Sequence, residues 1–226
     1  MKITFAIIPV SRFSNAKTRL SPKLTIDERE NLLKAMLKDV ISTLNGNVEK
    51  IILISSDDDV LYYAENFNVE PLKEIGNTGL NGGLAQAMDY CSKLCDNVLI
   101  VPSDVPLMKN THIKKILDLG EEYDVVISPA KGGGTNALLC PVENFKTRFG
   151  DYSFFEHIEE SKRNNLTYNI FDSFYLSLDV NTAEDLGEIM LHGSDTETSR
   201  YLKMVNLQVK SNHGSTRLKV TKEAFL

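Results

Sequence analysis

Basic residues are concentrated in one loop near the start of the 226-residue chain. The stretch SRFSNAKTRLSPKL follows a short apolar run and carries Arg12, Lys17, Arg19 and Lys23. Because Lys and Arg neutralise phosphate oxygens, the loop is suited to a triphosphate and its leaving pyrophosphate. Taken by itself, the stretch is explained equally well as a solvated basic loop without a ligand. Neither G-x-G-x-x-G nor G-x-x-x-x-G-K-[ST] occurs in it, so neither a dinucleotide fingerprint nor a P-loop is indicated.

Two carboxylates follow apolar segments that read as strands. Asp104 lies in VPSDVPLM, between two prolines that stiffen the turn, and Asp179 lies in LSLDVNTAEDL. A pair of carboxylates at two strand ends suits Mg²⁺, which binds a few carboxylates together with phosphate oxygens and water. The alternatives are a turn aspartate bonded to its own backbone and an ordinary strand end, with Asn181 or Thr182 capping the next helix.

A first glycine-rich stretch, EIGNTGLNGGLAQAM, leads into a predicted helix. Its central residues, Leu80, Asn81, Gly82 and Gly83, would let the backbone approach a flat ligand, and backbone groups could bind the edge of a nucleobase. A plain loop with Asn81 as the helix cap is the alternative.

A second glycine-rich stretch is KGGGTNALL, from Lys131 to Leu139. The backbone N–H groups from Gly132 to Thr135 could form a nest for an anion, and the Thr135 hydroxyl adds a donor. Downstream, RFGDYSFFEH places Gly150 and Ser153 at a helix start, where anions are also favoured. A glycine turn and a simple N-cap are the alternatives.

The sequence gives little support for histidine- or cysteine-based catalysis or for a Ser/His/Asp hydrolase. The four histidines are scattered without a shared motif, and no G-x-S-x-G elbow is present. Cys91, Cys95 and Cys140 are too few for a complete disulfide set and lack metal-ligand spacing, so we expect buried, reduced thiols.

The elements that position these residues alternate between strand and helix over about the first 130 residues. Apolar runs predict strands, and a capping box at Thr25 with apolar residues at helical spacing predicts a helix from about 26 to 44. The predicted strands are Ile3 to Val10, Lys50 to Ser55, NVEPLKE, DVVISPA, and a strand in NVLIVPSDVPLM that runs into an acidic loop. Predicted helices follow in DDDVLYYAEN, after GLNGG, and in NTHIKKILDLG, closed by Gly120. This order indicates a mostly parallel sheet with helices on both faces and ligands at the carboxyl ends of the strands.

The alternation loosens after KGGGTNALLCP. YSFFEHIEESKRN and TAEDLGEIMLHG predict helices, and LTYNIF and FYLSLDV predict strands. We assign residues 1–193 to one α/β domain. We assign residues 194–226, with strand-like pieces KMVNLQVK and RLKVT, to an arm or flexible tail that suggests a homodimer.

The amino-acid composition limits the kinds of partner and the location that we expect for the protein. The net charge of −6 argues against nucleic acid as the main partner. No apolar stretch approaches the ~20 residues of a membrane span, and no signal peptide is visible, so we expect a cytoplasmic protein with no membrane partner.

Taken in order, the motifs resemble a known family. The blocks IIPVSRFSNAKTRLS, GLNGGLAQA, VPSDVPLM, ISPAKGGGTNALL, RFGDYSFFEH and LDVNTAEDL are similar to those of the 2-phospho-L-lactate guanylyltransferases, the CofC family of coenzyme F420 biosynthesis. The resemblance covers about residues 1–190, and GGGTNALL and FGxxSFxxH are its specific parts. It implies a single-domain nucleotidyltransferase fold, Rossmann-like and of GT-A type, and transfer of GMP from GTP to 2-phospholactate.

The resemblance also implies roles for particular residues. Arg12, Lys17 and Arg19 would contact GTP, together with the Leu80–Gly83 segment. Asp104 and Asp179 would hold Mg²⁺, and Lys17, Arg19 and Asp104 would act in catalysis. Gly134, Thr135, Asn136, Gly150 and Ser153 would bind the acceptor. Relatives often carry a lysine where this chain has Ser11, which leaves open whether Arg12 replaces it.

Three questions stay open at this point. Phosphoenolpyruvate, the acceptor of bacterial relatives, differs from phospholactate by one sp² carbon. Guanine preference rests on the resemblance alone. A glycosyltransferase of the same sheet type, using a nucleotide sugar, and a non-catalytic nucleotide-binding module are the rival functions. Asp57 to Asp59 could imitate the D-x-D of a glycosyltransferase but opens a predicted helix.

Overall fold

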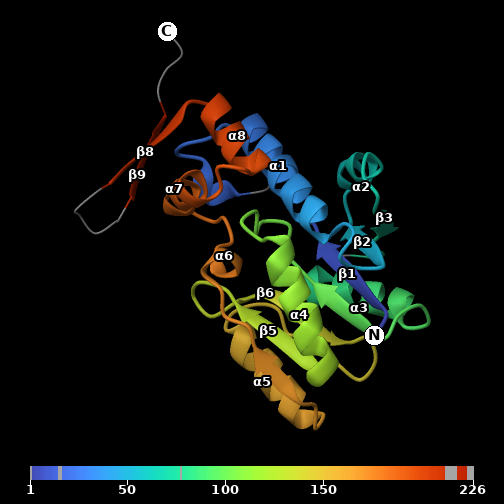
Figure 1. Cartoon of the computed structure of the whole chain (residues 1–226). Coiled ribbons are helices and arrows are strands. Elements are labelled where there is room, and N and C mark those ends of the chain that lie inside the picture. Colours follow the sequence, from blue (N-terminus) through green and yellow to red (C-terminus); the bar gives the residue numbers. More distant parts are fainter. Residues whose placement is uncertain (1, 15–16, 77, 212–217, 223–226) are drawn as a thin grey trace.

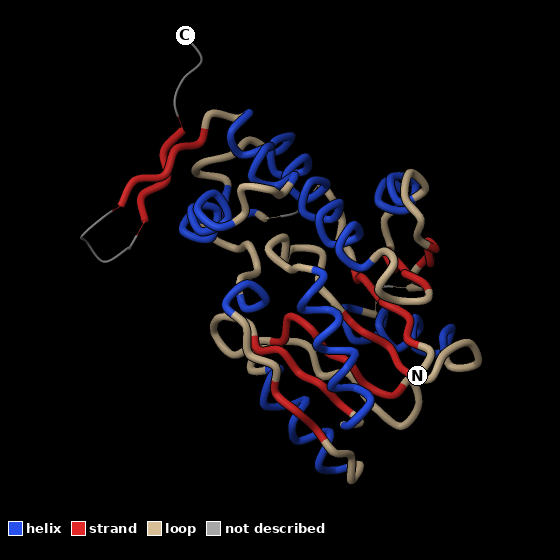
Figure 2. Tube along the Cα trace, in the orientation of Figure 1, coloured by secondary structure: helices blue, strands red, loops and turns tan. Residues whose placement is uncertain are grey.

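The computed structural model describes residues 2–14, 17–76, 78–211 and 218–222. A seven-stranded sheet forms its centre, with the strand order β3-β2-β1-β4-β6-β5-β7 (Figures 1 and 2). The strands are β1 (Thr4–Pro9), β2 (Lys50–Ser55), β3 (Glu70–Lys73), β4 (Asn97–Ile100), β5 (Val125–Pro129), β6 (Thr135–Pro141) and β7 (Tyr168–Ile170). Six strands run parallel to one another, and β6 is antiparallel to both of its neighbours. The predicted mixed, mostly parallel sheet is therefore confirmed.

Helices cover both faces of the sheet. They are α1 (Ile26–Leu44), α2 (Asp58–Ala64), α3 (Gly79–Cys91), α4 (Asn110–Glu122), α5 (Ser153–Arg163), α6 (Phe174–Ser177), α7 (Ala183–His192) and α8 (Glu197–Met204), with a 3₁₀ turn η1 at Thr18–Leu20. Figure 1 shows α4 in front of the strands and α3 behind them.

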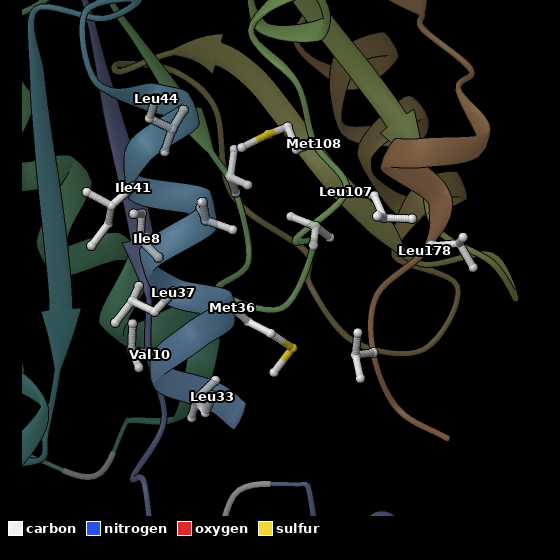
Figure 3. Close-up of a cluster of buried hydrophobic side chains, with 14 of the residues drawn as sticks. Ile8, Val10, Leu33, Met36, Leu37, Ile41, Leu44, Leu107, Met108 and Leu178 are labelled. Atoms are coloured by element: carbon white, nitrogen blue, oxygen red, sulfur yellow. The ribbon is translucent and has the colours of Figure 1, made fainter. Parts of the chain in front are cut away.

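The strand β1 shows how the two faces divide the core. Ala6 and Ile8 pack into one apolar cluster with α1, α2 and α4, whereas Phe5 and Ile7 pack into a second cluster with α3. Successive side chains of a strand point to opposite faces, so an uninterrupted apolar run is what a doubly covered strand requires. Figure 3 shows the first cluster, where Leu37 of α1 lies beside Ile8 and Val10, and Met36 extends from the other side of the helix.

The predicted start of α1 is confirmed in detail. Thr25 caps the helix by accepting from the Glu28 N–H at 3.3 Å, and the Glu28 side chain accepts from the Thr25 N–H at 2.9 Å. This reciprocal pairing satisfies two backbone donors that a helix start otherwise leaves without partners.

Two helix boundaries differ from the prediction. Helix α3 begins at Gly79 after Thr78, so Asn81, Gly82 and Gly83 lie in its first turns and Asn81 is not the cap. Helix α4 continues past Gly120 to Glu122. Gly120 serves packing instead of termination, because a Cβ there would lie 2.3 Å from Leu139 Cδ2 of β6.

The prediction of a strand in FYLSLDV is wrong. Residues Phe174–Ser177 form the short helix α6, and the chain then runs extended without joining the sheet. Its backbone groups bond to loops at the sheet edge instead. Ser177 O accepts from the Lys131 N–H at 2.8 Å, and the Val180 N–H donates to Asp104 O at 3.0 Å. The segment therefore fastens the loop after β5 to the loop after β4.

The residues after 193 include a helix that the sequence did not predict. Helix α8 extends to Met204, so the first part of KMVNLQVK is helical, and the strands β8 (Leu207–Ser211) and β9 (Leu218–Lys222) form an antiparallel hairpin apart from the main sheet (Figure 2). The Asp39 carboxylate of α1 accepts from the N–H groups of Glu197 and Thr198 at 2.8 and 2.9 Å and so joins α8 to α1. The division of the chain at residue 193 stays a prediction.

Within the described residues, the three cysteines are buried and free, as expected. No helix in that part of the chain is long and apolar enough to cross a membrane.

Candidate active site

Lys17 and Asp104 meet at the carboxyl edge of the two central strands. The Lys17 ammonium contacts Asp104 Oδ2 and donates to Asn181 Oδ1 at 3.2 Å. The two paired side chains are only 11% and 19% exposed. Lys17 itself has a left-handed backbone with φ 53°, and its carbonyl accepts from the Leu20 N–H at the start of η1. Such conformations are uncommon outside glycine and are concentrated at functional sites.

A polar pocket surrounds this ion pair. Its lining includes Ser11, Lys17, Arg19, Ser103 and Asp104. The basic loop after β1 therefore faces the acidic loop after β4, as the parallel topology requires for neighbouring strands. The arrangement places two predicted phosphate ligands, Lys17 and Arg19, beside a predicted metal ligand.

Asp179 is brought close to Asp104 by the extended segment after α6. Burial raises the pKa of the Asp179 carboxyl, and the Asp104 carboxylate raises it further. Two amides compensate in part: Asn136 Nδ2 donates to Asp179 Oδ1 at 3.3 Å, and Asn181 Nδ2 donates to Asp179 Oδ2. Two facing carboxylates and one ammonium leave a local excess of negative charge.

This donor set fits a hard divalent cation. Mg²⁺ takes oxygen ligands and is usually held by one or two carboxylates with phosphate oxygens and water. Asp104 and Asp179 supply the carboxylates, and their mutual repulsion is what a bound cation would relieve. Within the described part of the chain, no group of three or more His, Cys, Asp or Glu side chains is arranged to hold a metal.

A second pocket extends from Asp104 toward β3. It is lined by the Arg12 loop on one side and by the first turns of α3 on the other, including Leu80, Gly83 and Leu84. Its length crosses the ends of β4, β1, β2 and β3, and its walls are partly apolar. A flat ring system with a phosphate toward Asp104 matches this shape.

Two residues predicted for nucleotide binding have structural contacts instead of facing this pocket. Asn81 donates to Phe149 O at 2.7 Å and accepts from the Phe149 N–H at 2.8 Å, which fixes the loop before α5. Gly82 lies beneath Thr78, because a Cβ at Gly82 would come 2.3 Å from Thr78 Cβ. Arg12, Lys17, Arg19, Leu80 and Gly83 do line one of the two pockets.

The loop from Gly132 to Gly134 makes a tight turn between β5 and β6. Gly132 and Gly133 have φ values of 93° and 89°, which favour glycine. The Gly133 N–H donates to Ala130 O at 3.1 Å and the Ala130 N–H donates to Gly134 O at 2.8 Å. One N–H group of the predicted anion nest is therefore already bonded inside the turn.

Thr135 and Asn136, the first residues of β6, point in opposite directions. Thr135 faces α5, where Ser153 Oγ lies 3.2 Å and His157 Nδ1 lies 2.9 Å from its hydroxyl. Asn136 faces α6 and the Asp179 carboxylate. Gly150 accepts from the Ser153 N–H at 3.2 Å. The predicted acceptor residues thus gather around Thr135, except Asn136, which joins the carboxylates.

His157 has one defined tautomer in this cluster. The Arg148 backbone N–H donates to Nε2 at 2.9 Å, so Nε2 is the unprotonated nitrogen and Nδ1–H donates to the Thr135 hydroxyl. The Thr135 oxygen then acts as acceptor, and its own proton is left to be donated elsewhere. Burial lowers the His157 pKa to about 4, so the ring is neutral at physiological pH.

Sequence patterns did not reveal three of these contributors. Asn181 was expected at most to cap a helix, yet Thr182 is the cap and Asn181 bonds to Lys17 and Asp179. His157 and Glu74, which also lines the second pocket, had no spacing signal that pointed to a site. The Asp57–Asp59 run begins α2: Asp57 Oδ1 accepts from the Asp59 N–H at 2.9 Å, and Asp58 pairs with Lys73.

This chain is similar to known proteins over nearly its whole length. A family model described as "Guanylyl transferase CofC like" matches residues 4–223. The 2-phospho-L-lactate guanylyltransferase of Methanobrevibacter smithii is 51% identical over 96% of this chain and 97% of its own length. The enzyme of the same name from Methanothermobacter thermautotrophicus is 52% identical over 97% and 98%.

Solved structures share the fold at much lower identity. A candidate nucleotide-diphospho-sugar transferase from Desulfovibrio desulfuricans aligns with a TM-score of 0.76 at 19% identity, over 90% of this chain and 95% of its own. A 4-diphosphocytidyl-2C-methyl-D-erythritol synthase from Anaerococcus prevotii aligns with a TM-score of 0.59 at 13% identity, over 89% and 99%.

The neutral, buried His157 predicts a pH dependence of stability. Its folded pKa of about 4 lies below the unfolded value of 6.5, so its contribution to stability is complete above pH 6.5 and is lost as pH falls toward 4. We expect a loss of about 3 kcal/mol in the free energy of unfolding across this window. Urea unfolding of wild type and His157→Asn at several pH values measures it. Parallel pH profiles for the two proteins would contradict the assignment.

Proposed function

The chain belongs to the family of CofC-like guanylyl transferases, and we propose that it transfers GMP from GTP to the phosphate of 2-phospho-L-lactate, within coenzyme F420 biosynthesis. The products are lactyl-2-diphospho-5′-guanosine and pyrophosphate. The observation that carries the proposal is the Lys17–Asp104–Asp179 group, at the end of a pocket of nucleoside shape. Relatives named 2-phospho-L-lactate guanylyltransferase align over nearly the whole chain, which supports 2-phospho-L-lactate as the acceptor.

The reaction needs alignment and charge neutralisation more than proton transfer. An oxygen of the acceptor phosphate attacks the α-phosphorus of GTP in line, the bond from that phosphorus to the bridging oxygen breaks, and pyrophosphate leaves with the electron pair. A phosphate monoester has its second pKa near ~6, so the nucleophile is already ionised at neutral pH and no general base is required. The neutral His157 is consistent with this.

Particular residues supply the neutralisation. Lys17 and Arg19 line the polar pocket and would bind the triphosphate, and Arg12 lines the second pocket, which shares Asp104 with the first. Asp104 and Asp179 would hold Mg²⁺. That ion, when bound, would offset phosphate charge and help to align the α-phosphate. Once phosphate oxygens enter the pocket, the Lys17 ammonium gains them as partners besides Asp104.

Thr135, Ser153 and Gly150 would hold the phosphate of the acceptor. Thr135 and Ser153, the first residues of β6 and α5, are only 4% and 2% exposed. Tyr152 in that turn is 70% exposed and has a left-handed φ of 57°. We expect the Tyr152 turn to shift outward when the acceptor binds through these hydroxyls.

Phosphoenolpyruvate is the alternative acceptor, because it offers the same carboxylate and phosphate with a planar carbon. A glycosyl transfer is disfavoured because the acidic run at residues 57–59 begins α2 and pairs with Lys73. A cytoplasmic location and a homodimer built through the β8–β9 hairpin stay predictions.

The proposal is tested by pyrophosphate release from GTP and Mg²⁺ with 2-phospholactate, phosphoenolpyruvate or no acceptor. We expect release that depends on 2-phospholactate, with a lower kcat/KM for phosphoenolpyruvate. No pyrophosphate with either phospho-acid would refute the proposed transfer.

Asp104→Asn should abolish the Mg²⁺-dependent turnover while the fold stays intact. The substitution keeps the size of the side chain but removes one of two carboxylates, and we expect a fall in kcat of about 10²-fold or more. The matched control is Asp58→Asn, a carboxylate that pairs with Lys73 and is 89% exposed. Near-normal turnover of Asp104→Asn would remove Asp104 from the cation site.

Thr135→Val should raise the acceptor KM far more than the GTP KM. The substitution keeps the shape and removes a hydroxyl donor to the acceptor phosphate, which corresponds to about tenfold in KM. The GTP KM should change by less than about twofold, since the nucleotide pocket is separate. Thr4→Val is the control, as Thr4 is buried at the opposite edge of the sheet. Equal changes in both KM values would contradict the division of the two substrates.

A further inference from the structure

Glu74 stands at the far end of the nucleoside-shaped pocket from Asp104. It follows β3 directly, and its N–H donates to Ser55 O at 2.9 Å, which extends the pairing of β3 with β2 by one residue. Asp104 follows β4, three strand spacings away across β2 and β1. At about 4.8 Å per spacing, β3 and β4 are roughly 14 Å apart, on the scale of a nucleoside monophosphate laid across the sheet edge.

A chain of hydrogen bonds holds the Glu74 carboxylate in place. Gln86 of α3 binds the Ile75 backbone at two points, accepting from its N–H at 2.9 Å and donating to its carbonyl at 3.0 Å. The same amide donates to Thr78 Oγ1 at 3.4 Å, and the Thr78 hydroxyl donates to Glu74 Oε1 at 3.0 Å. A carboxylate offers four lone-pair sites, and among the residues that the structure describes the Thr78 hydroxyl is the hydrogen-bond partner of one of them.

Two consecutive glycines of α3 make room for this arrangement. A Cβ at Gly83 would lie 3.2 Å from Glu74 Cδ, so the carboxylate lies almost directly on the helix backbone. A Cβ at Gly82 would come within 2.5 Å of Thr78 Oγ1, the group that orients the carboxylate. The glycine pair thus serves the position of Glu74 in addition to any approach of a ligand.

The walls next to Glu74 suit a flat aromatic ring. Leu84 is fully buried in the pocket floor, whereas Leu80 at its rim is 49% exposed. Phe149 lines the pocket as well, held in place by Asn81. An apolar slot that ends in an oriented carboxylate selects a ring with two adjacent N–H donors at its edge.

Among nucleobases, guanine alone has that edge. Its N1–H and N2–H₂ groups point the same way and can each donate to one carboxylate oxygen, whereas adenine offers an acceptor at N1. We propose that Glu74 is the specificity-determining residue for the base and accepts from N1–H and N2–H₂ of guanine. This inference rests on the proposed function, because it takes the pocket to hold the guanosine part of GTP.

The test compares GTP with ITP, whose base lacks only the N2 amino group, and with ATP. One hydrogen bond to a charged acceptor changes binding affinity by about 10- to 100-fold. The wild-type kcat/KM should therefore be higher for GTP than for ITP by that factor. In Glu74→Gln the amide can still accept from N1–H but opposes N2–H₂ with a donor. The GTP-to-ITP ratio should therefore collapse to within about threefold of unity, mainly through KM.

A matched control comes from β3, the strand that precedes Glu74. Glu70 of β3 pairs with Lys50 and bonds to Tyr90, outside the pocket, so Glu70→Gln should keep the wild-type ratio. A Glu74→Gln enzyme that is active and keeps the wild-type GTP-to-ITP ratio would overturn the proposal.

Equilibrium binding of Mg²⁺–GTP and Mg²⁺–ITP, without acceptor, separates this proposal from the proposed function. Suppose that GTP yields no pyrophosphate with either acceptor, yet wild type binds GTP more tightly than ITP and Glu74→Gln removes that difference. The assignment of Glu74 to the base would then hold, and the proposed GMP transfer would be refuted. If Glu74→Gln does not fold, Thr78→Val replaces it. That variant keeps the carboxylate but loses its orienting hydroxyl, and it should lower the binding ratio at least threefold; an unchanged ratio would overturn the assignment.

Discussion

The ion pair between Lys17 and Asp104 is the contact on which the arrangement of the site depends. It joins loops that are 87 positions apart in sequence and adjacent in space, because β1 and β4 are parallel neighbours at the centre of the sheet. Both side chains are mostly buried, and isolated charges in that setting would be costly, so each requires the other or a ligand of equivalent charge. Asn181 and Asp179 extend the same network to the segment after α6.

The reversed strand β6 adds the second half of the site. Because it runs antiparallel to β4 and β5, its first residues lie at the edge where the other strands end. The glycine turn before it is what allows the chain to reverse there. The hydroxyl cluster around Thr135 and the amide of Asn136 are thereby placed beside carboxylates that come from β4 and from the α6 segment. A wholly parallel sheet would have put these two residues at the opposite edge.

Local sequence signals predicted most of the fold and a part of the site. The capping box fixed the start of α1, and uninterrupted apolar runs located the buried strands, because both patterns act within a few residues. The strand prediction for FYLSLDV was wrong because the backbone partners of this segment, Lys131 and Asp104, come from loops that are distant in the sequence. Gly82 and Gly120 suggested a loop and a helix end, whereas tertiary packing needs their missing side chains. The tautomer of His157 depends on a hydrogen bond from the Arg148 N–H, so it could be assigned only from the structure.

The opposite directions of Thr135 and Asn136 have a thermodynamic consequence. One peptide bond joins the two residues; the Thr135 side chain bonds to Ser153 and the Asn136 side chain bonds to Asp179. A ligand that displaced Thr135 would therefore perturb the amide that donates to Asp179, and a cation bound at Asp179 would perturb the threonine in return. Such reciprocity is a free-energy coupling between two binding events, equal in both directions. The dipeptide at the start of β6 would thus make the binding of the proposed cation and the binding of the proposed acceptor depend on each other.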